Sequence, residues 1–308
     1  MASFRAHLAA FLVKRRIRGK LARISDVRDI RRIFGQARPP LPKEVGFRGG
    51  TVGGIDGEWA ETATSAKTTM MYIHGGGFVA CSPQTHRPIT AALARRGFRV
   101  FAPAYRLAPE HPFPAAIDDV VAAWRALRRE TSGAMVVAGD SAGGTLALAL
   151  MIWLRDRGEP LPAAAVLFSP ATDLAGTGAS HQENSRRDAM FRPEILKRFR
   201  IAYLGSADPK NPLVSPLYAD LKALPPLFIE VGQTEVLRDD AVRLAERARA
   251  VGVQAELKVW PVVPHVWQMA DAFIPEARRS LDAAAQFLHG RANAATAPQP
   301  QRVKEMSQ

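Results

Sequence analysis

The stretch Met135–Arg157 reads MVVAGDSAGGTLALALMIWLRDR and places a sharp glycine-rich turn between two apolar segments. Its first residues, Met135–Ala138, predict a buried strand, and Ala142–Arg157 predicts a long helix. The turn between them, residues 139–143, is a G-x-S-x-G motif in the strand–turn–helix context of a nucleophilic serine. Its glycines let strand and helix approach closely enough to hold Ser141 in strained backbone angles, with its hydroxyl above the sheet edge. A glycine-rich turn that binds phosphate is the alternative.

Short apolar segments alternate with helical patterns on both sides of this turn. The other expected strands are Thr68–Ile73, Arg99–Pro103, Ala164–Phe168, Leu227–Val231 and Glu256–Trp260. The other expected helices are Pro83–Arg96, Ala115–Arg129, Asp239–Val251 and Asp271–Leu288. Continuous apolar strands that alternate with helices predict a parallel sheet covered by helices on both faces. The glycine-rich segment Phe47–Glu61 predicts an antiparallel strand pair at the start of the sheet.

The N-terminal segment, residues 1–45, differs from this body. Apolar residues recur there at helical spacing, beginning with Phe4, Leu8, Phe11 and Leu12. This pattern predicts amphipathic helices over residues 3–34, interrupted at Gly19. Three prolines within residues 36–45 end the region, so we place the domain boundary there.

The body itself contains one break in the alternation. We expect residues 46–290 to form the α/β domain, with residues 173–224 inserted over one edge of the sheet. The insertion contains one helical stretch, Pro193–Tyr203, and together with the N-terminal helices it is expected to form a cap. Residues 291–308 lack an apolar period and are expected to form a disordered tail.

Positive charge is concentrated at the N-terminus. The chain has a formal charge of +13, and residues 1–45 carry twelve Lys/Arg against three Asp/Glu, which gives +9 and leaves +4 for the remainder. A strongly basic protein raises nucleic acid or an anionic membrane as a partner. A basic segment on a nearly neutral body requires only a local explanation, so we expect no nucleic-acid partner.

The sequence also limits targeting, membrane insertion and metal binding. Leu8–Val13 is too short for a secretion signal and precedes the main charge cluster. The apolar window Ala134–Leu154 is interrupted by Asp140 and three glycines, which is untypical of a membrane span. Cys81 is the one cysteine, which excludes an internal disulfide and a thiolate metal cluster. We expect a soluble, cytoplasmic protein without stable membrane insertion and without a metal or cofactor.

A second glycine-rich motif, His74-Gly75-Gly76-Gly77-Phe78, follows the expected strand Thr68–Ile73. Three consecutive glycines leave backbone N–H groups unobstructed, so the loop can aim them at an oxyanion. Ala142, next after the serine, would supply a further N–H. A flexible turn before the helix that follows is the alternative.

A reactive serine needs a base, and the base needs a carboxylate, in the chain order Ser, acid, His. His265 follows the last expected strand in the loop where the base should lie, whereas His289 ends a helix beside the tail. The other histidines are interpreted as structural: His7, His74, His86, His111 and His181. For the acid, Glu235 is the first carboxylate after the strand Leu227–Val231. Asp239 and Asp240 fall where a helix begins and are expected to cap it.

With these residues the chain resembles the bacterial hormone-sensitive-lipase-like (family IV) carboxylesterases of the α/β-hydrolase superfamily. The resemblance spans residues 45–290 and rests on several separated motifs in the right order. They are HGGGF at His74–Phe78, YRLAPEHPFPAA at Tyr105–Ala116, GDSAGG at Gly139–Gly144, and the loops of Glu235 and His265. The sequence departs from many relatives at the acid, where they have aspartate and this chain has Glu235. The resemblance implies an α/β-hydrolase fold, with a mostly parallel eight-stranded sheet and a helical cap.

The resemblance also assigns further residues. It implies that Gly76, Gly77 and Ala142 donate the oxyanion-binding N–H groups, and that the basic N-terminal helices form the solvent face of the cap. Phe78 and Trp267 are expected to line the pocket or to belong to the core. The loop Tyr105–Ala116 is interpreted as structural, with Glu110 holding it by hydrogen bonds, and Asp140 as packing near the elbow. A homodimer through Glu256–Trp260 is a further implication.

These expectations combine into a cofactor-free serine hydrolase. Ser141, His265 and Glu235 would cleave short-acyl carboxylic esters through an acyl-enzyme. A lactone hydrolase, a deacetylase of small molecules or an amidase would use the same chemistry. A non-catalytic binding protein of the same fold is an alternative that the presence of His265 disfavours. A further alternative is an adaptor protein that binds membrane or nucleic acid through its basic N-terminus.

Overall fold

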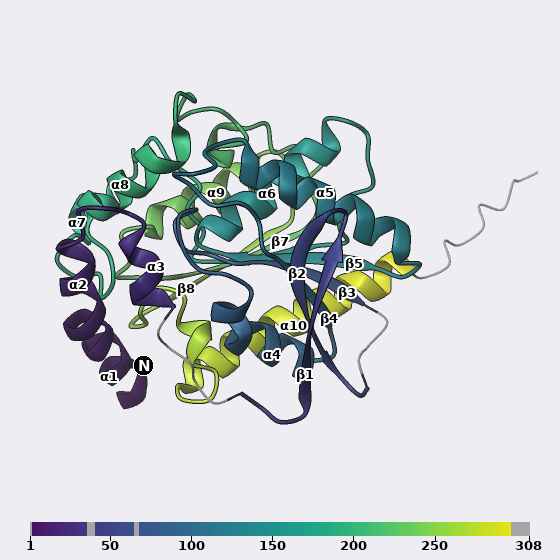
Figure 1. Cartoon of the computed structure of the whole chain (residues 1–308), viewed down its shortest axis with the longest axis horizontal. Helices are drawn as coiled ribbons and strands as arrows, with labels where there is room; N and C mark the ends of the chain where they lie inside the picture. Colours follow the sequence, from purple (N-terminus) through teal and green to yellow (C-terminus); the bar gives the residue numbers. More distant parts are fainter. Residues whose placement is uncertain (1, 36–40, 65–67, 297–308) are drawn as a thin grey trace, which may run out of the picture.

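An eight-stranded sheet runs through the centre of the computed structural model, which describes residues 2–35, 41–64 and 68–296 (Figure 1). The strand order is β1-β2-β4-β3-β5-β6-β7-β8, and only the pairs β1–β2 and β2–β4 are antiparallel. The strands are β1 Val45–Val52, β2 Ile55–Thr62, β3 Thr69–Ile73, β4 Arg99–Pro103, β5 Met135–Asp140, β6 Ala165–Phe168, β7 Leu227–Gly232 and β8 Ala255–Trp260. The predicted sheet is therefore confirmed, including its antiparallel start.

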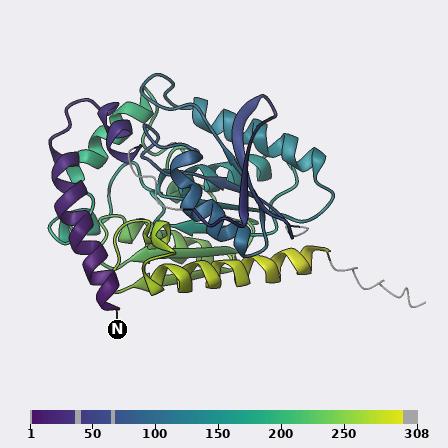
Figure 2. The ribbon, with the colours of Figure 1, turned by 60° about the horizontal axis from the view of Figure 1, so that its bottom comes forward.

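Helices cover both faces of this sheet, as the continuous apolar strands require (Figures 1 and 2). One face carries α4 (Arg87–Arg95) and α10 (Pro275–Thr296). The opposite face carries α5 (Ala115–Glu130), α6 (Ala142–Arg155) and α9 (Arg238–Ala250). Because the strands are buried on both faces, two apolar cores form, one on each side of the sheet.

The C-terminal helix is longer than predicted. Helix α10 continues through Arg291 to Thr296, so the tail predicted from residue 291 is wrong for this part. Ala292 lies buried against the core of that face, which explains the extension. Residues 297–308 lie outside the described residues.

The N-terminal helix also corrects the sequence analysis. Helix α1 (Phe4–Val13), a π-helical turn (Lys14–Arg18) and α2 (Gly19–Ala22) are continuous, so the predicted break at Gly19 is wrong. In this described segment the helical structure is interrupted only between Ala22 and the start of α3 (Asp29–Phe34). A single glycine costs a helix about 1 kcal/mol, which packing outweighs here because Leu21 is buried. Phe4 and Phe11, expected on the apolar face, are 80% and 53% exposed.

Helix α3 is attached to the body by Arg31. Its guanidinium donates to the carbonyl oxygens of Val79 and Ala108 and to the carboxylate of Glu110. The Arg31–Glu110 pair, 2.6 Å apart, lowers the pKa of Glu110 to about 2. Glu110 thus binds the N-terminal segment, rather than only its own loop as predicted.

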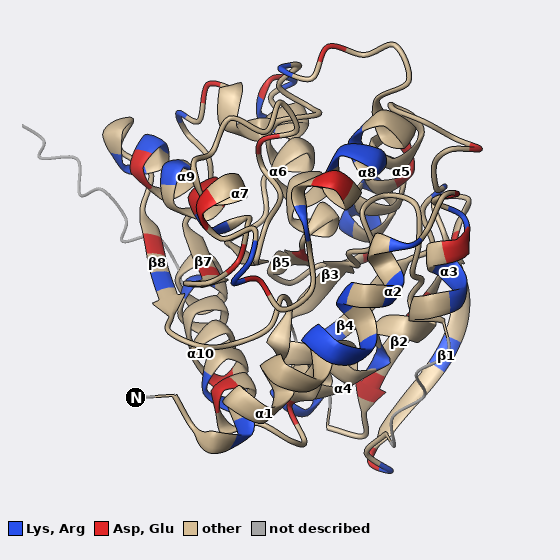
Figure 3. Ribbon diagram, turned by 90° about the vertical axis from the view of Figure 1, so that its left-hand side faces the viewer, with Lys and Arg blue, Asp and Glu red and all other residues tan. Residues whose placement is uncertain are grey.

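Many Lys and Arg of this segment lie on the outer side of the molecule, together with those of the neighbouring α8 (Figure 3).

Residues 173–224 lie over the same end of the sheet as α1–α3 (Figure 1). They contain α7 (Ser180–Glu183), α8 (Pro193–Leu204) and a 3-10 turn (Pro216–Tyr218). No described helix is both long and apolar enough to cross a membrane.

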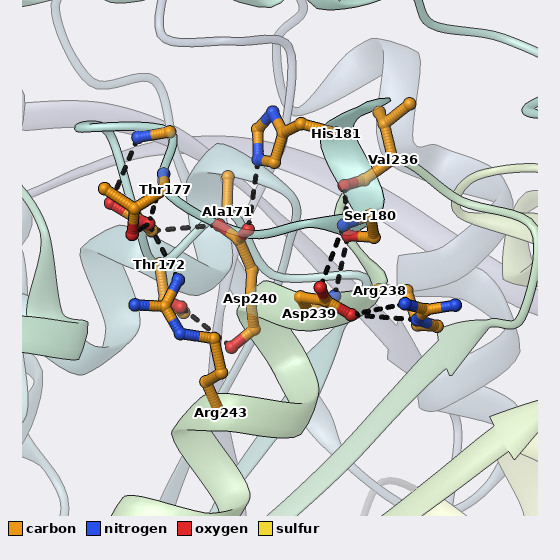
Figure 4. A network of polar contacts seen from close by, with 12 residues as sticks. Ala171, Thr172, Thr177, Ser180, His181, Val236, Arg238, Asp239, Asp240 and Arg243 are labelled. Carbon is orange, nitrogen blue, oxygen red and sulfur yellow. Dashed lines mark hydrogen bonds and ion pairs between the residues drawn. The ribbon is translucent and has the colours of Figure 1, made fainter. Parts of the chain in front are cut away.

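A polar network attaches this insertion to the start of α9 (Figure 4). Asp240 accepts a hydrogen bond from the Asp173 amide at 2.9 Å and contacts His181 Nε2 at 3.4 Å. Asp239 accepts one from the Ser180 amide at 2.8 Å. The prediction that Asp239 and Asp240 cap α9 is therefore wrong. Their carboxylates instead satisfy polar groups of the insertion that folding buries.

Candidate active site

Ser141 lies between the end of β5 and the start of α6. Its backbone angles, φ 53° and ψ −121°, are strained for a residue with a side chain, and the residue is 7% exposed. The two motif glycines are required by close contacts. A Cβ on Gly139 would lie 2.5 Å from the Gly143 carbonyl oxygen, and one on Gly143 would lie 1.9 Å from that of Ile73. The strand and helix thus approach as the motif predicts, with the serine at the turn.

The glycine loop after β3 lies beside this turn. Gly76 and Gly77 have φ values of 116° and 63°, and a Cβ on Gly76 would lie 2.1 Å from the Ala80 carbonyl oxygen. Within the described residues, the amides of Gly76, Gly77 and Ala142 donate no hydrogen bond to another protein group. Three free N–H groups near one serine are the donors that a tetrahedral oxyanion requires.

Asp140 holds the loop against the turn. Its carboxylate accepts hydrogen bonds from the Tyr72 hydroxyl at 2.6 Å and from the Gly75 amide at 3.1 Å. His86 Nε2 lies 3.3 Å from the same carboxylate. Burial raises the pKa of Asp140, but His86 and Tyr72 outweigh burial and lower it. Asp140 therefore has the structural role expected of it.

Glu235 and His265 meet although 30 residues separate them. His265 Nδ1 lies 2.5 Å from Glu235 Oε2, and the two residues are 5% and 1% exposed. Glu235 Oε1 accepts further hydrogen bonds from the Ser169 hydroxyl at 2.8 Å and the Gly232 amide at 2.6 Å. Burial lowers the pKa of His265, but the Glu235 carboxylate and more distant acids outweigh burial and raise it. The pair is thus built to stabilise an imidazolium in a buried place.

The second ring nitrogen of His265 is free to act as a base. With Nδ1 donating to Glu235, Nε2 is the acceptor nitrogen. It is buried and makes no hydrogen bond within the described residues, so it is not hydrogen-bonded to the Ser141 hydroxyl in this conformation. Ser141 and His265 nevertheless line the same cavity. Catalytic hydrogen bonds are often long without substrate and shorten in the substrate complex.

Two cavities open at Ser141. The larger, about 530 Å³, lies beneath the N-terminal helices and is lined on that side by Ala9, Val13 and Ile17. The smaller, about 40 Å³, lies beneath α8 and is lined by residues that include Leu196 and Phe199. His265 lines the larger cavity and is not among the residues lining the smaller.

The predicted pocket residues Phe78 and Trp267 lie on different cavities. Phe78 lines the smaller cavity and stacks on Tyr203, with ring centroids 3.7 Å apart. Trp267 lines the larger cavity and packs against Trp260 at 5.7 Å. Both are nearly fully buried, so each forms a cavity wall and part of the core. The described residues contain no group of three His, Cys, Asp or Glu placed to hold a metal ion.

Sequence reasoning missed several contributors to the site. Ser169 directly follows β6 and donates a hydrogen bond to the Glu235 carboxylate, but no motif marks it. Asn184 and Asp188 of the insertion bond the backbone of the acid loop. Their sequence separation from Glu235 is large, and no periodicity connects them. The helical spacing of Ala9, Val13 and Ile17 is visible in the sequence, but only the folded chain shows that these residues face the cavity.

Known proteins that are similar in sequence and in structure agree with this geometry. The α/β hydrolase fold family matches residues 70–269. An acetyl-hydrolase of Streptomyces hygroscopicus is 44% identical over 241 residues, which cover 77% of this chain and 81% of that protein. An esterase of Acinetobacter venetianus is 36% identical and covers 80% of this chain, with 83% of its own length matched. A crystal structure of an esterase from the bacterial hormone-sensitive lipase family superimposes with a TM-score of 0.88 at 37% identity, over 95% of this chain and 99% of that one. The chain therefore belongs to the hormone-sensitive-lipase-like family of α/β-hydrolases and is a carboxylic ester hydrolase.

Proposed function

We propose that this esterase cleaves short-acyl carboxylic esters through a Ser141–His265–Glu235 triad and an acyl-enzyme intermediate. The observation that carries the proposal is the buried Glu235–His265 contact, which leaves His265 Nε2 without a partner in a residue that lines the same cavity as Ser141. An imidazole fixed in this tautomer by a carboxylate is a base for a serine hydroxyl. The free N–H groups of Gly76, Gly77 and Ala142 complete the arrangement.

The reaction follows from these positions. Ser141 Oγ attacks the ester carbonyl carbon while His265 Nε2 takes its proton, and the carbonyl oxygen becomes an oxyanion bound by the three amides. His265 then gives the proton to the alcohol oxygen as the ester C–O bond breaks. Water attacks the acyl-enzyme, His265 takes one of its protons and returns it to Ser141, and the carboxylic acid leaves.

The lining of the two cavities supports a proposal for where each half of the ester binds. His265 must protonate the departing alcohol, so the alcohol occupies the larger cavity, which His265 lines. The acyl chain then occupies the smaller cavity. A volume of about 40 Å³ holds roughly three water-sized groups, which corresponds to acyl chains from acetyl to butyryl. The relative named acetyl-hydrolase supports the short-acyl proposal.

The walls of the larger cavity support a second part of the proposal, that the N-terminal helices and residues 173–224 form a cap. The mostly apolar lining of this cavity, partly from α1, fits a bulky apolar alcohol. Lactones and acetylated small molecules would use the same acyl transfer.

The test compares Ser141→Ala with the unaltered protein on p-nitrophenyl acetate. We expect folded Ser141→Ala to lose ester cleavage, and a fluorophosphonate probe to label the unaltered protein but not the variant. Turnover by the folded variant would reject Ser141 as the nucleophile. An unaltered protein that neither reacts with the probe nor cleaves esters would instead support the non-catalytic binding protein.

A further inference from the structure

Asp188 is a buried acidic residue of the insertion, between α7 and α8, that takes no part in the acyl transfer described above. It is 1% exposed. Its Oδ1 accepts hydrogen bonds from the amides of Met190 at 2.7 Å and Phe191 at 2.9 Å, and its Oδ2 accepts one from the Val236 amide at 2.8 Å. A carboxylate removed from water requires such donors, and here all three come from the backbone.

Two of these amides belong to residues beside the acid and the base. Val236 directly follows Glu235 in the chain. The ring of Phe191 packs edge-on against the imidazole of His265, with centroids 4.8 Å apart and an interplanar angle of 68°. One carboxylate therefore fixes both the loop that carries the acid and the aromatic wall of the base.

Asn184 holds the same loop from its carbonyl side. It is fully buried, and its Nδ2 donates to the carbonyl oxygens of Gln233 at 3.0 Å and Glu235 at 2.8 Å. The insertion thus bonds N–H and C=O groups of residues 233–236, which lie 48 or more positions away in the sequence. A loop of this kind would otherwise depend on water and on its own turn for its shape.

We propose that Asp188 is a positioning residue, which fixes Glu235 and His265 in their working orientation by holding the amides of Val236 and Phe191. The proposal rests on the ester hydrolysis proposed above. It gives the insertion a role in the geometry of the triad in addition to covering the site.

The charge of Asp188 gives this role a specific signature. Burial lowers the pKa of His265, and the negative charges of Glu235, Asp188 and Asp140 raise it. Asp188 itself faces Glu235 from the acid loop and Arg18 from the N-terminal helical segment. Removal of the Asp188 charge therefore lowers the pKa of His265, which a purely structural residue would not do.

Asp188→Asn is the variant that separates these effects. The carboxamide has the same size, and its oxygen can keep the hydrogen bonds from Met190 and Phe191. Its NH2 group then faces the Val236 amide, donor against donor. We expect kcat on p-nitrophenyl acetate to fall roughly tenfold to hundredfold, the cost of a misplaced catalytic group. KM changes little because Asp188 lines neither cavity and the carboxamide oxygen keeps the hydrogen bond from Phe191, which lines both. The acidic limb of the pH profile of kcat/KM moves to lower pH.

Asp239→Asn is the matched control. Asp239 also accepts an amide hydrogen bond from the insertion, at Ser180, but it is not among the charges that raise the pKa of His265. We expect Asp239→Asn to lower the midpoint of thermal unfolding and to leave the acidic limb of the kcat/KM profile at the same pH as in the unaltered protein. If both variants move the limb equally, or if folded Asp188→Asn keeps the unaltered kcat and limb, the positioning role is wrong.

A second variant covers the case in which Asp188→Asn does not fold. Asn184→Ala removes the hydrogen bonds to the loop carbonyls without a change of charge, and we expect kcat to fall several-fold at similar KM. An unchanged kcat in folded Asn184→Ala would also overturn the proposal. An unaltered protein without esterase activity would instead refute the proposed function itself, so the two failures are distinguishable.

Discussion

Leu196→Ala tests which cavity receives the acyl chain. Leu196 lies on α8, lines the smaller cavity and does not line the larger one. The substitution removes three carbon atoms from the wall of a cavity of about 40 Å³. We therefore expect the cavity to gain room for two or three methylene groups, which extends the acyl chains accepted from butyryl to hexanoyl.

The magnitude follows from packing energies. A hexanoyl chain in the unaltered cavity overpacks it, at a cost of about 1–3 kcal/mol. Relief of about 1.4 kcal/mol raises the ratio of kcat/KM for hexanoyl over acetyl esters about tenfold. The free energy of unfolding of the variant falls by about 2 kcal/mol, because a buried leucine is truncated. This is the low end of the usual cost of about 2–5 kcal/mol, since the side chain already borders a cavity.

The assay measures kcat/KM for p-nitrophenyl esters from acetate to octanoate. Val13→Ala is the reciprocal variant, because Val13 lines only the larger cavity; it should alter the preference among alcohols and leave the acyl profile unchanged. If Leu196→Ala leaves the acyl profile unchanged and Val13→Ala extends it, the acyl chain binds in the larger cavity and the assignment is reversed.

Further predictions concern the triad and the fold. Glu235→Gln should lower kcat about 10³–10⁴-fold, because an amide no longer holds the imidazole tautomer; a loss below tenfold in steady-state assays would show another acid at work. The acidic limb of kcat/KM should lie above the ordinary histidine value of about 6.5, because the pKa of His265 is raised and its protonated form cannot act as base. The raised pKa of His265 also stabilises the folded protein below about pH 6.5, and this stabilisation is lost as the pH rises through the pKa of the folded state. The free energy of unfolding, measured as a function of pH, tests this. Gly143→Ala should cost about 4 kcal/mol or more in guanidinium unfolding, since its Cβ would lie 1.9 Å from a backbone oxygen of Ile73. Arg31→Met should cost about 2 kcal/mol by loss of hydrogen bonds to two carbonyls, and an unchanged unfolding midpoint would contradict this.

Much of the fold was predictable because its signals are local. The apolar runs of the central strands and the glycine turn at Ser141 are contiguous in the sequence, and the strands lie within a few residues of their predicted positions. The elbow is equally local, because Gly139 and Gly143 are required by contacts within one turn and its neighbouring strand.

Other features were mispredicted or missed because tertiary contacts override local signals. Gly19 lies inside a continuous helix because packing outweighs the cost of one glycine. Asp239 and Asp240 have the composition of a helix cap, yet they bond the insertion across 59 or more positions of sequence. Asp188 belongs to no motif, and its importance is visible only when Val236 and Phe191 are found beside it.

By itself the sequence determined the order of strands and helices, the strained serine turn, the glycine loop and the histidine and glutamate that pair. These depend on residue types within short windows, or on the fixed order of motifs along the chain. Only the folded chain decided the size of the two cavities, the acceptor nitrogen of His265, and the bonds that Asp188 and Asn184 make to the acid loop. Such features arise where distant segments pack together, and the free energy of a buried polar group depends on neighbours that no short window contains.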